Sequence, residues 1–547
     1  MTNTAETSAD SLYEWFGDAA RAHPDAVALE VDGVAWTYRR LANAAGNIAS
    51  RILSVCDGQV PRRVGLLASR TATAYAGYLA VLRLGATVVP LGTSFPAERN
   101  AAVAAAARLD VVLADGSADS TGLCDRALVL DHARLAASAD ESVPSIRAGE
   151  PRRAAYILFT SGSTGVPKGV PISHGNVCAF LRNTVARYGA GPGARVSQTF
   201  DLTFDPSVFD MFAAWGSGAT LVVPTRADLL APVRFVNRHA ITHWNSVPSV
   251  ISIAHRLRML RPEAMPTLRR SVFCGEPLTL DQAEAWRIAA PHSRVENAYG
   301  PTELTVTCTS YTLPHELRDW PRTHNGTVPI GTPYPGVEYR VIDGELCVRG
   351  PQRFDGYLDP ADDNGRFYTA DGHPYDPNTP LDHTHWYRTG DRISTTPDSA
   401  DRPVLIHLGR TDEQVQVQGY RVELAEIAAA LREIPEIADA AVVPLTRPGG
   451  DTTLAAAFTT DPHSNDPTTD TLRRHLQRRL PDYMIPRNFL RLDALPLNPR
   501  GKIDRPALAQ LITDADPRAT PRTRAGRDAT DGAWSARHQG RAVRPDR

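Results

Sequence analysis

Short apolar runs alternate with longer stretches rich in Ala and Leu over roughly the first 400 residues. The runs are almost continuously hydrophobic, as in strands that are buried on both faces, and the intervening stretches are typical of helices. This alternation predicts an α/β fold whose sheets are covered by helices. The expected strands are residues 63–69, 86–91, 110–115, 126–131, 154–160 and 219–224.

The pattern changes between residues 358 and 403, where Asp, Pro, Gly and Thr predominate. These residues favour loops, here near a domain edge. A compact α+β pattern follows Gly409. Its expected elements are a helix at 422–434, strands at 440–445 and 453–460, and a helix at 471–480. We therefore expect a large N-terminal domain at 1–408 and a small domain at 409–512.

The last stretch, residues 513–547, contains eight Arg and almost no aliphatic residues. Such a segment cannot bury enough apolar surface to offset the entropy of ordering, so we expect disorder there. An interaction tail is the alternative.

The amino-acid composition limits the classes of molecule that the protein could bind. Of 547 residues, 42% are hydrophobic, and 59 Lys and Arg against 61 Asp and Glu leave a net charge of -2. A nucleic-acid binder would carry a basic excess, so we expect a small molecule or another protein as the partner. The six cysteines form no CxxC pair, and the chain shows neither an export signal nor a stretch that could span a membrane. A cytoplasmic protein fits these features.

A loop of small and hydroxyl-bearing residues follows the apolar run at 154–160. Its hydroxyls and unhindered backbone N–H groups suit a phosphate, and a lysine adds positive charge. The spacing is not GxxxxGK[ST], which disfavours a P-loop NTPase. The loop residues are Thr160, Ser161, Gly162, Ser163, Thr164, Gly165 and Lys168.

Two later segments add nucleotide chemistry. In NAYGPTE (297–303), Tyr299 can stack on a purine and Glu303 can supply an oxygen ligand to Mg²⁺. In YRTGD (387–391), the carboxylate of Asp391 can accept both hydroxyls of a ribose. Each of these segments alone is weak evidence for a nucleotide site.

The segments GRTDEQVQVQGYRVEL (409–424) and LPLNPRGKIDRPAL (495–508) complete an ordered set of five. With this set the chain resembles an amino-acid adenylation domain of the nonribosomal peptide synthetase type, in the superfamily of acyl-CoA synthetases and luciferases. The resemblance runs from Leu12 to Leu508. It implies a large N-terminal domain, a small mobile C-terminal domain and an active site between them.

The resemblance implies that a substrate carboxylate attacks the α-phosphorus of ATP, which gives an acyl-adenylate and pyrophosphate. Because two anions must meet, the site has to neutralise charge, and the implied catalytic residues are Lys502, Thr302 and Glu303. Glu303 would hold Mg²⁺. Besides the loop residues, the implied nucleotide contacts are Gly275, Glu276, Asn297, Ala298, Tyr299, Gly300, Asp391 and Arg410.

In the family, a phosphopantetheine thiol then takes the acyl group after the small domain rotates. Asp412 matches the hinge, and Gly419 matches the glycine that lets the thiol arm pass. Gln416 and Gln418 stand where Lys and Arg are common, which puts the contacts of this second state in doubt. The implied partner is a carrier protein acting in trans, and a small activating protein is a further candidate.

Asp205, in TFDPSVFDMF (203–212), falls where amino-acid-activating members keep an aspartate for the substrate ammonium. An aryl or fatty acid has no ammonium, and an unpaired buried carboxylate would be costly. The alternatives are that Asp205 caps a helix, that Asp210 supplies the charge, or that the substrate is a β-amino acid, whose ammonium would be shifted. The implied pocket is mostly apolar, which suits a small or medium side chain. Its other residues are Pro206, Phe209, Asn245, Val272, Cys274, Ala298, Val306 and Thr307.

Two other functions remain open. An acyl- or aryl-CoA ligase is disfavoured by Asp205 and by the GPTE sequence. A catalytically silent adenylate-binding protein is disfavoured by the presence of Lys502, Glu303 and Asp391. His383 and His385 resemble a metal pair, but no third ligand is evident and a loop role is favoured.

Overall fold

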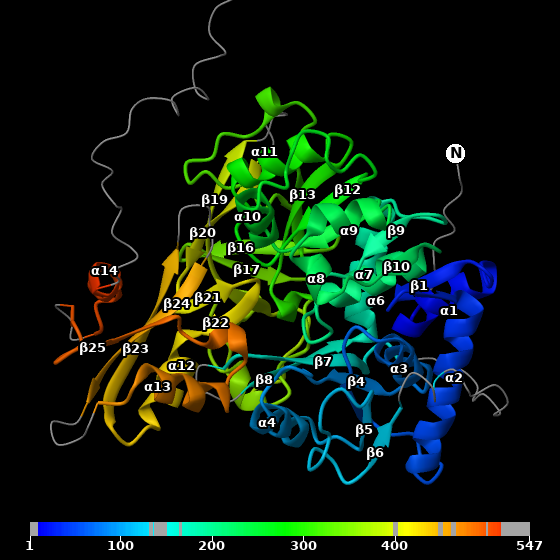
Figure 1. Ribbon diagram of the computed structural model, residues 1–547, viewed down its shortest axis with the longest axis horizontal. Helices are drawn as coiled ribbons and strands as arrows, with labels where there is room; N and C mark the ends of the chain where they lie inside the picture. Colours follow the sequence, from blue (N-terminus) through cyan, green and yellow to red (C-terminus); the bar gives the residue numbers. More distant parts are fainter. Residues whose placement is uncertain are drawn as a thin grey trace, which may run out of the picture.

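The computed structural model describes residues 9–130, 135, 150–162, 167–397, 403–446, 452–460, 466–498 and 502–515. Three residues of the expected phosphate loop, Ser163, Thr164 and Gly165, lie outside these ranges, as does the Arg-rich stretch after Ala515. Figure 1 shows a large body formed by the N-terminal three quarters of the chain, with the last elements packed against one side of it.

A six-stranded sheet contains most of the expected strands. It is parallel except where β7 meets β8, and α3 (Ala72–Arg83) packs on its central strands. α4 (Ala97–Ala107) lies beside β8 (Figure 1). In spatial order the strands are β6 (Ala127–Val129), β5 (Val111–Ala114), β3 (Arg63–Leu67), β4 (Thr87–Pro90), β7 (Ala154–Thr160) and β8 (Lys168–Ser173).

A nine-stranded sheet forms the second layer. Its middle strands are parallel, and both ends turn antiparallel. In spatial order the strands are β15 (Thr332–Pro333), β14 (Thr309–Thr312), β13 (Arg294–Tyr299), β12 (Arg270–Phe273), β11 (His243–Ser246), β9 (Arg195–Ser197), β10 (Thr220–Val222), β1 (Val27–Val31) and β2 (Val34–Thr37).

Helices cover both sheets. The α7 helix (Pro206–Gly216) is buried along almost its whole length because its sequence, PSVFDMFAAWG, is apolar on every face. The other helices of the large domain are α1 (Leu12–Ala22), α2 (Tyr38–Val55), α6 (His174–Tyr188), α8 (Arg226–Leu229), α9 (Pro232–Arg238), α10 (Ser249–Arg256) and α11 (Leu280–Ala289).

A five-stranded antiparallel sheet closes the large domain. Its longest strand, β19, spans Trp386–Pro397, inside the segment that the sequence predicts to be loops. That part of the expectation is wrong because β19 is paired on both sides, which satisfies its backbone despite a polar sequence. The other strands are β16 (Glu338–Ile342), β17 (Glu345–Arg349), β18 (Phe367–Tyr368) and β20 (Pro403–Arg410).

The small domain follows closely, since β20 ends at Arg410 and the next strand begins at Gln414. It consists of a hairpin, a three-stranded sheet and helices that share an apolar core. Its elements are β21 (Gln414–Val417), β22 (Tyr420–Glu423), α12 (Leu424–Arg432), β23 (Ile437–Thr446), β24 (Thr452–Thr460), α13 (Thr469–Gln477), β25 (Asn488–Arg491) and α14 (Arg505–Ala515).

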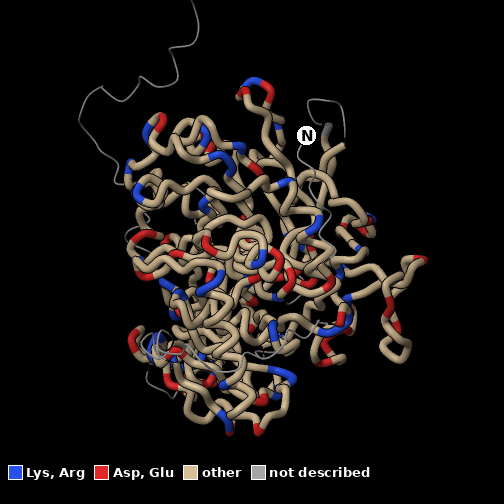
Figure 2. Tube along the Cα trace, turned by 90° about the vertical axis from the view of Figure 1, so that its right-hand side faces the viewer, with Lys and Arg blue, Asp and Glu red and all other residues tan. Residues whose placement is uncertain are grey.

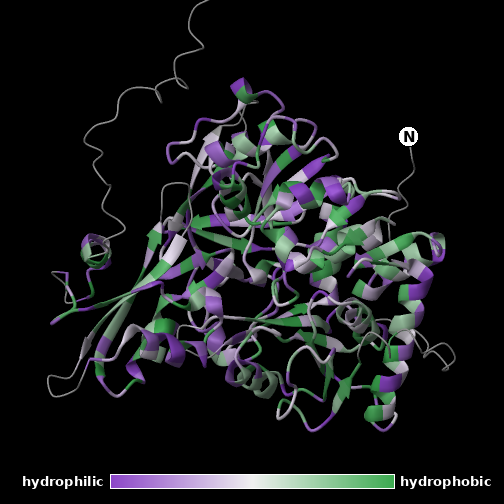
Figure 3. Ribbon diagram, viewed as in Figure 1, coloured by the Kyte–Doolittle hydropathy of each residue, from purple (hydrophilic) through white to green (hydrophobic). Residues whose placement is uncertain are grey.

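The α/β expectation is confirmed, and each expected strand overlaps an observed one. Apolar residues concentrate along the sheets and the helix faces that meet them (Figure 3). Acidic and basic residues intermingle over the face in Figure 2, in keeping with a net charge of -2. Within the described ranges, no helix is both long and apolar enough to cross a bilayer.

A glycine at the junction of two sheets gives a stability test. Gly331 has φ +83°, and a Cβ built there would lie 1.8 Å from the carbonyl oxygen of Ser310. Gly326 has φ +70°, with nothing within 4 Å of such a Cβ. We expect Gly326→Ala to cost about 1 kcal/mol of stability from its φ alone, and Gly331→Ala about 2 kcal/mol more. Thermal denaturation measures both, and equal shifts in melting temperature would contradict the close contact.

Candidate active site

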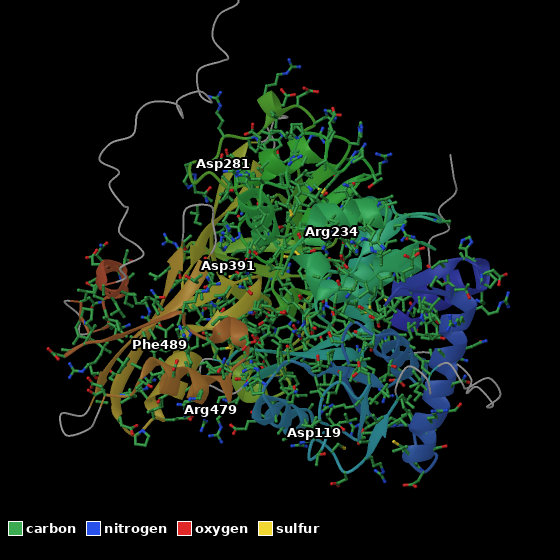
Figure 4. The ribbon with its side chains drawn as sticks, in the orientation of Figure 1. Asp119, Arg234, Asp281, Asp391, Arg479 and Phe489 are labelled. Atoms are coloured by element: carbon green, nitrogen blue, oxygen red, sulfur yellow. The ribbon has the colours of Figure 1, made fainter. Side chains whose placement is uncertain are left out.

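A cleft of about 1690 Å³ lies between the large domain and the β21–β22 hairpin. Loops that follow β12 and β13, together with Asp391 within β19, form one wall, and residues of the hairpin form the other. In Figure 4, Asp391 marks this region near the middle of the molecule, and Phe489 and Arg479 mark the small domain beside it. Of the expected nucleotide contacts, those lining the cleft are Gly275, Glu276, Asn297, Ala298, Tyr299, Gly300, Asp391 and Arg410.

Asp391 sits at the centre of a polar cluster. Tyr299 donates its hydroxyl to Asp391 Oδ2 at 2.5 Å, while Arg410 Nη1 and His407 Nε2 lie 2.8 Å and 3.1 Å from Oδ1. Burial alone would raise the pKa of Asp391, but the bond to His407 and the charge of Arg410 outweigh it and lower the pKa. The carboxylate is therefore held ionised. His407 was missed by the sequence analysis.

Asn297 has a structural role in the cleft, unlike the ionised Asp391. Its side-chain amide donates to the carbonyl oxygens of Val328 and Pro329, each at 3.0 Å, so the side chain ties loops together. Gly300 has no room for a side chain, since a Cβ would lie 2.5 Å from the Cα of Thr307. These residues shape the cleft.

Glu303 lies in the short turn η1 (Thr302–Leu304) and is fully buried. Tyr357 donates its hydroxyl to Oε1 at 2.6 Å, and Arg421 Nη1 lies 3.0 Å from both carboxylate oxygens. Burial would raise the pKa of Glu303, but Arg421 and Tyr357 outweigh it and lower the pKa. Arg421 and Tyr357 were not predicted, because both pairings join residues far apart in the chain.

The chemistry of Glu303 fits a hard cation such as Mg²⁺, because it is an ionised carboxylate buried directly after Thr302, which lines the cleft. Among the described residues, no group of three or more His, Cys, Asp and Glu could enclose a metal. His385 Nδ1 pairs with Asp382 Oδ1 at 2.9 Å, in keeping with the loop role preferred for His383 and His385.

The described part of the phosphate loop already has protein partners. Thr160 ends β7, and Ser161 donates its hydroxyl to the carbonyl oxygen of Arg421 at 2.8 Å. Lys168 is buried, and its Nζ lies 2.7 Å from Asp362 Oδ1. Asp362, in the Asp-rich segment, is another residue that sequence reasoning missed.

Asp205 precedes α7, but its side chain makes no capping hydrogen bond. It accepts hydrogen bonds from the Thr302 hydroxyl and the Val306 backbone N–H, while its Oδ2 has no partner. Burial dominates and raises its pKa to about 7. The capping alternative therefore fails, and Asp205 presents a carboxylate without a counter-ion at the mouth of the cleft.

A smaller cavity adjoins the cleft, and the two share Cys274, Ala298 and Val306 in their linings. Asn245 Nδ2 donates to Asp210 Oδ1 at 2.9 Å, while Asp210 Oδ2 has no hydrogen-bond partner within the described ranges. Thr307 and Tyr334 share a hydrogen bond of 2.9 Å. The expected residues that line it are Phe209, Asn245, Val272, Cys274, Ala298, Val306 and Thr307. Those that were missed are Phe180, Thr184, Arg187, Tyr188, Glu296 and Tyr334.

The charged residues at the polar end of this cavity pair with one another, although Glu296 Oε1 has no hydrogen-bond partner among the residues that the structure describes. Arg187 Nη2 lies 3.0 Å from Glu296 Oε1, and Arg270 Nη1 lies 3.0 Å from Oε2. Charges here are paired within the protein, so the cavity suits a small or uncharged group. Pro206 lines the main cleft instead, and Cys274 is fully buried with its thiol 3.9 Å from Asn245 Oδ1.

The hairpin docks through Gly419. Its N–H donates to Glu276 Oε1 at 2.8 Å, and a Cβ at Gly419 would lie 2.3 Å from Cγ1 of Val247. Gly419 also has φ +82°, a backbone conformation that favours glycine. Asp412, in the link before the hairpin, lies 2.6 Å from Arg410 Nε. Gln416 faces the cleft.

Lys502 does not lie in the cleft in this structure. It is exposed, and its backbone N–H donates to the side chain of Asn498 at 3.1 Å. It precedes α14, which lies at the outer edge of the small domain (Figure 1). The expectation that Lys502 faces the reacting groups is not met here, because this placement of the small domain brings Arg421 to the cleft.

The chain matches known family models and curated relatives in sequence. Residues 16–358 match the model of the AMP-binding enzyme, and residues 426–502 match that of the AMP-binding enzyme C-terminal domain. Phosphinothricin tripeptide synthetase PhsC of Streptomyces viridochromogenes is 36% identical over 92% of this chain and 45% of its own length. The chain thus spans less than half the length of this relative.

Solved structures resemble the chain as well. The Vibrio cholerae adenylation domain AlmE, in complex with glycyl-adenosine-5'-phosphate, aligns with TM-score 0.76 and 26% identity over 94% of this chain and 100% of its own. An artificially fused adenylation–PCP di-domain, NpsA-ThdA from Klebsiella oxytoca, aligns with TM-score 0.75 and 25% identity over 88% of this chain and 94% of its own.

The uncompensated Asp205 predicts an unusual pH dependence of stability. Its pKa is raised from 3.8 to about 7, so the folded protein binds the proton more tightly than the unfolded chain does. The destabilisation is absent below pH 3.8, grows as the pH rises toward 7 and is complete above it. We expect Asp205→Asn to raise the melting temperature of the ligand-free protein, and by more at pH 8 than at pH 5.5.

Asp228 is the control for this test, since its hydrogen bonds to Thr225 and the charge of Arg238 lower its pKa despite the opposing effect of burial. Asp228→Asn should lower the melting temperature at pH 8. A decrease for Asp205→Asn that is equal at both pH values would contradict the uncompensated carboxylate.

Proposed function

Because the chain belongs to the AMP-binding enzyme family, as an adenylation domain of the nonribosomal peptide synthetase type, we propose that it activates an amino acid. The reaction couples the amino acid and ATP to give aminoacyl-AMP and pyrophosphate. Transfer of the aminoacyl group to the phosphopantetheine thiol of a separate carrier protein follows.

One observation carries this proposal: a single cleft joins a polar cluster around Asp391 to the unpaired carboxylate of Asp205. A nucleotide and a cation-bearing substrate can bind there side by side. The distinction from a fatty or aryl acid rests on Asp205, because an ammonium would supply the missing counter-ion and a purely anionic substrate would not.

Each residue of the site would contact a different part of the substrates. Tyr299 would contact the adenine and Asp391 the ribose hydroxyls, while the loop that begins at Thr160, with Lys168, would bind the phosphates. Glu303, beside Thr302, would hold Mg²⁺, which neutralises the phosphates when bound. Asp205 would orient the amino acid so that its carboxylate points toward the nucleotide.

The small domain would serve both half-reactions in different placements. Lys502 would enter the cleft for adenylation, where its charge lets the two anions approach. We assign the arrangement described above, in which Gly419 contacts Glu276 and Lys502 lies outside the cleft, to the transfer step. Support for a carrier comes from the similarity to an adenylation–PCP di-domain.

Amino-acid-dependent exchange of pyrophosphate into ATP tests the activity. We expect exchange with one or a few small or medium amino acids and none with fatty or aryl acids. Asp205→Asn should raise the KM for the amino acid about 10- to 100-fold, the value of a hydrogen bond to a charged group, and leave the KM for ATP nearly unchanged. Activity confined to aryl or fatty acids would reject the proposal in favour of a CoA ligase.

The Lys502→Ala variant tests whether Lys502 acts in adenylation but not in thioester formation. Adenylation should fall at least about 100-fold, because a positioned charge is lost from the transition state. Thioester formation from preformed aminoacyl-AMP and a carrier protein should change little, since Lys502 lies outside the cleft in the docked arrangement. Rapid-quench assays of each step give the two rates, and a comparable loss in both would argue against this division.

A further inference from the structure

Three neighbouring parallel strands build the cavity beside the cleft in layers. β11, β12 and β13 pair so that Asn245, Val272 and Glu296 lie side by side, and alternate residues of a strand face the same side of the sheet. Cys274 and Ala298, which line both the cleft and the cavity, therefore form the layer nearer the cleft. Two residues along a strand span about 6.5 Å, which is the depth of Glu296 beyond Ala298.

Two buried oxygens of the cavity lining lack hydrogen-bond partners. Glu296 Oε1 lies 3.0 Å from Arg187 Nη2 as an ion pair, but it accepts no hydrogen bond from any described residue. The hydroxyl of Tyr188, on α6, has no partner in the described ranges either, and Tyr188 is 3% exposed. Both residues line the cavity. Because buried polar groups are normally hydrogen-bonded, this pair points to a ligand group that supplies the missing partners.

The charges around Glu296 restrict what that ligand group can be. Arg270 Nη1 donates to Glu296 Oε2 at 3.0 Å, so two guanidinium groups, of Arg187 and Arg270, already flank this one carboxylate. They would repel a side-chain ammonium, and a side-chain carboxylate would have no proton to donate to Glu296 Oε1. An apolar side chain would leave both oxygens unpaired. A neutral group that both donates and accepts a hydrogen bond fits both oxygens.

We propose that the activated amino acid carries a side chain that ends in a hydroxyl or a primary amide, and that Glu296 and Tyr188 select it. The inference rests on the proposed function, in which Asp205 binds the ammonium. The side-chain group donates to Glu296 Oε1 and accepts from the Tyr188 hydroxyl, while Arg187 and Arg270 are positioning residues that hold the carboxylate. Since every amino acid carries the ammonium, discrimination among side chains falls to Glu296 and Tyr188.

Exchange of pyrophosphate into ATP tests the side-chain class, with the twenty proteinogenic amino acids, homoserine and norvaline as substrates. The depth of Glu296 favours homoserine and glutamine over serine. The best substrate should exceed its isostere at least about 100-fold in kcat/KM, because an apolar end leaves two buried oxygens unpaired. The isosteric pairs are homoserine with norvaline, glutamine with methionine or glutamate, and threonine with valine.

Highest activity with any side chain other than a hydroxyl or an amide would overturn this inference and leave the proposed function standing. Absence of exchange with every amino acid would reject the proposed function as well. The two failures are therefore distinguishable.

Tyr188→Phe tests recognition without disturbing the fold. It removes an oxygen that has no hydrogen-bond partner among the described residues, so the melting temperature should not fall. We expect kcat/KM for the best substrate to fall about tenfold and that for its apolar isostere to be maintained. Tyr78→Phe is the matched control, because the Tyr78 hydroxyl is also buried and unpartnered among the described residues but Tyr78 lines neither the cavity nor the cleft. It should leave both values unchanged.

Glu296→Gln tests the charge of the cavity. It leaves Arg187 and Arg270 without their shared counter-ion, which a side-chain carboxylate of the substrate can replace. The ratio of kcat/KM for glutamate to that for glutamine should therefore rise at least about tenfold. If Glu296→Gln does not fold, Tyr188→Phe decides alone. Substrate ratios that stay unchanged in Tyr188→Phe would overturn the inference.

Discussion

The placement of the two domains depends on one buried carboxylate. Glu303 is completely enclosed, and removing the partner of a buried charge typically costs about 3–5 kcal/mol. Tyr357 supplies one hydrogen bond, but only a cation can balance the charge. Arg421 does so from a different domain, which makes the electrostatics of the large domain a condition on where the small domain rests.

Most other charges in the cleft are balanced in the same way. Lys168 is matched by Asp362, and Asp391 has His407 and Arg410 beside it. Asp205 is the contrast, since burial dominates its environment and no basic side chain approaches it among the described residues. Burial also raises the pKa of Glu276, another carboxylate of the cleft, whose partners are the backbone N–H groups of Ser249 and Gly419. Asp205, with one oxygen unpartnered in the described part of the chain, selects for a ligand that carries a positive charge.

Much of the fold followed from local sequence, because continuous apolar runs such as residues 154–160 can only be buried strands. Part of the candidate site could also be predicted from the sequence, because glycine-containing turns and acidic residues next to strands indicate their chemistry by residue type. What could not be foreseen was pairing across long sequence distances, as between Arg421 and Glu303 or Lys168 and Asp362. The position of Lys502 could not be predicted from the sequence either, because it depends on the orientation of a whole domain.

The connection between the domains has a kinetic and thermodynamic consequence. Only three residues, 411–413, separate β20 from β21. Such a short tether keeps the hairpin at a high effective concentration beside the cleft, so its groups behave as an intramolecular ligand. A hairpin peptide added in trans would pay the full translational entropy of association and would bind the isolated large domain only feebly.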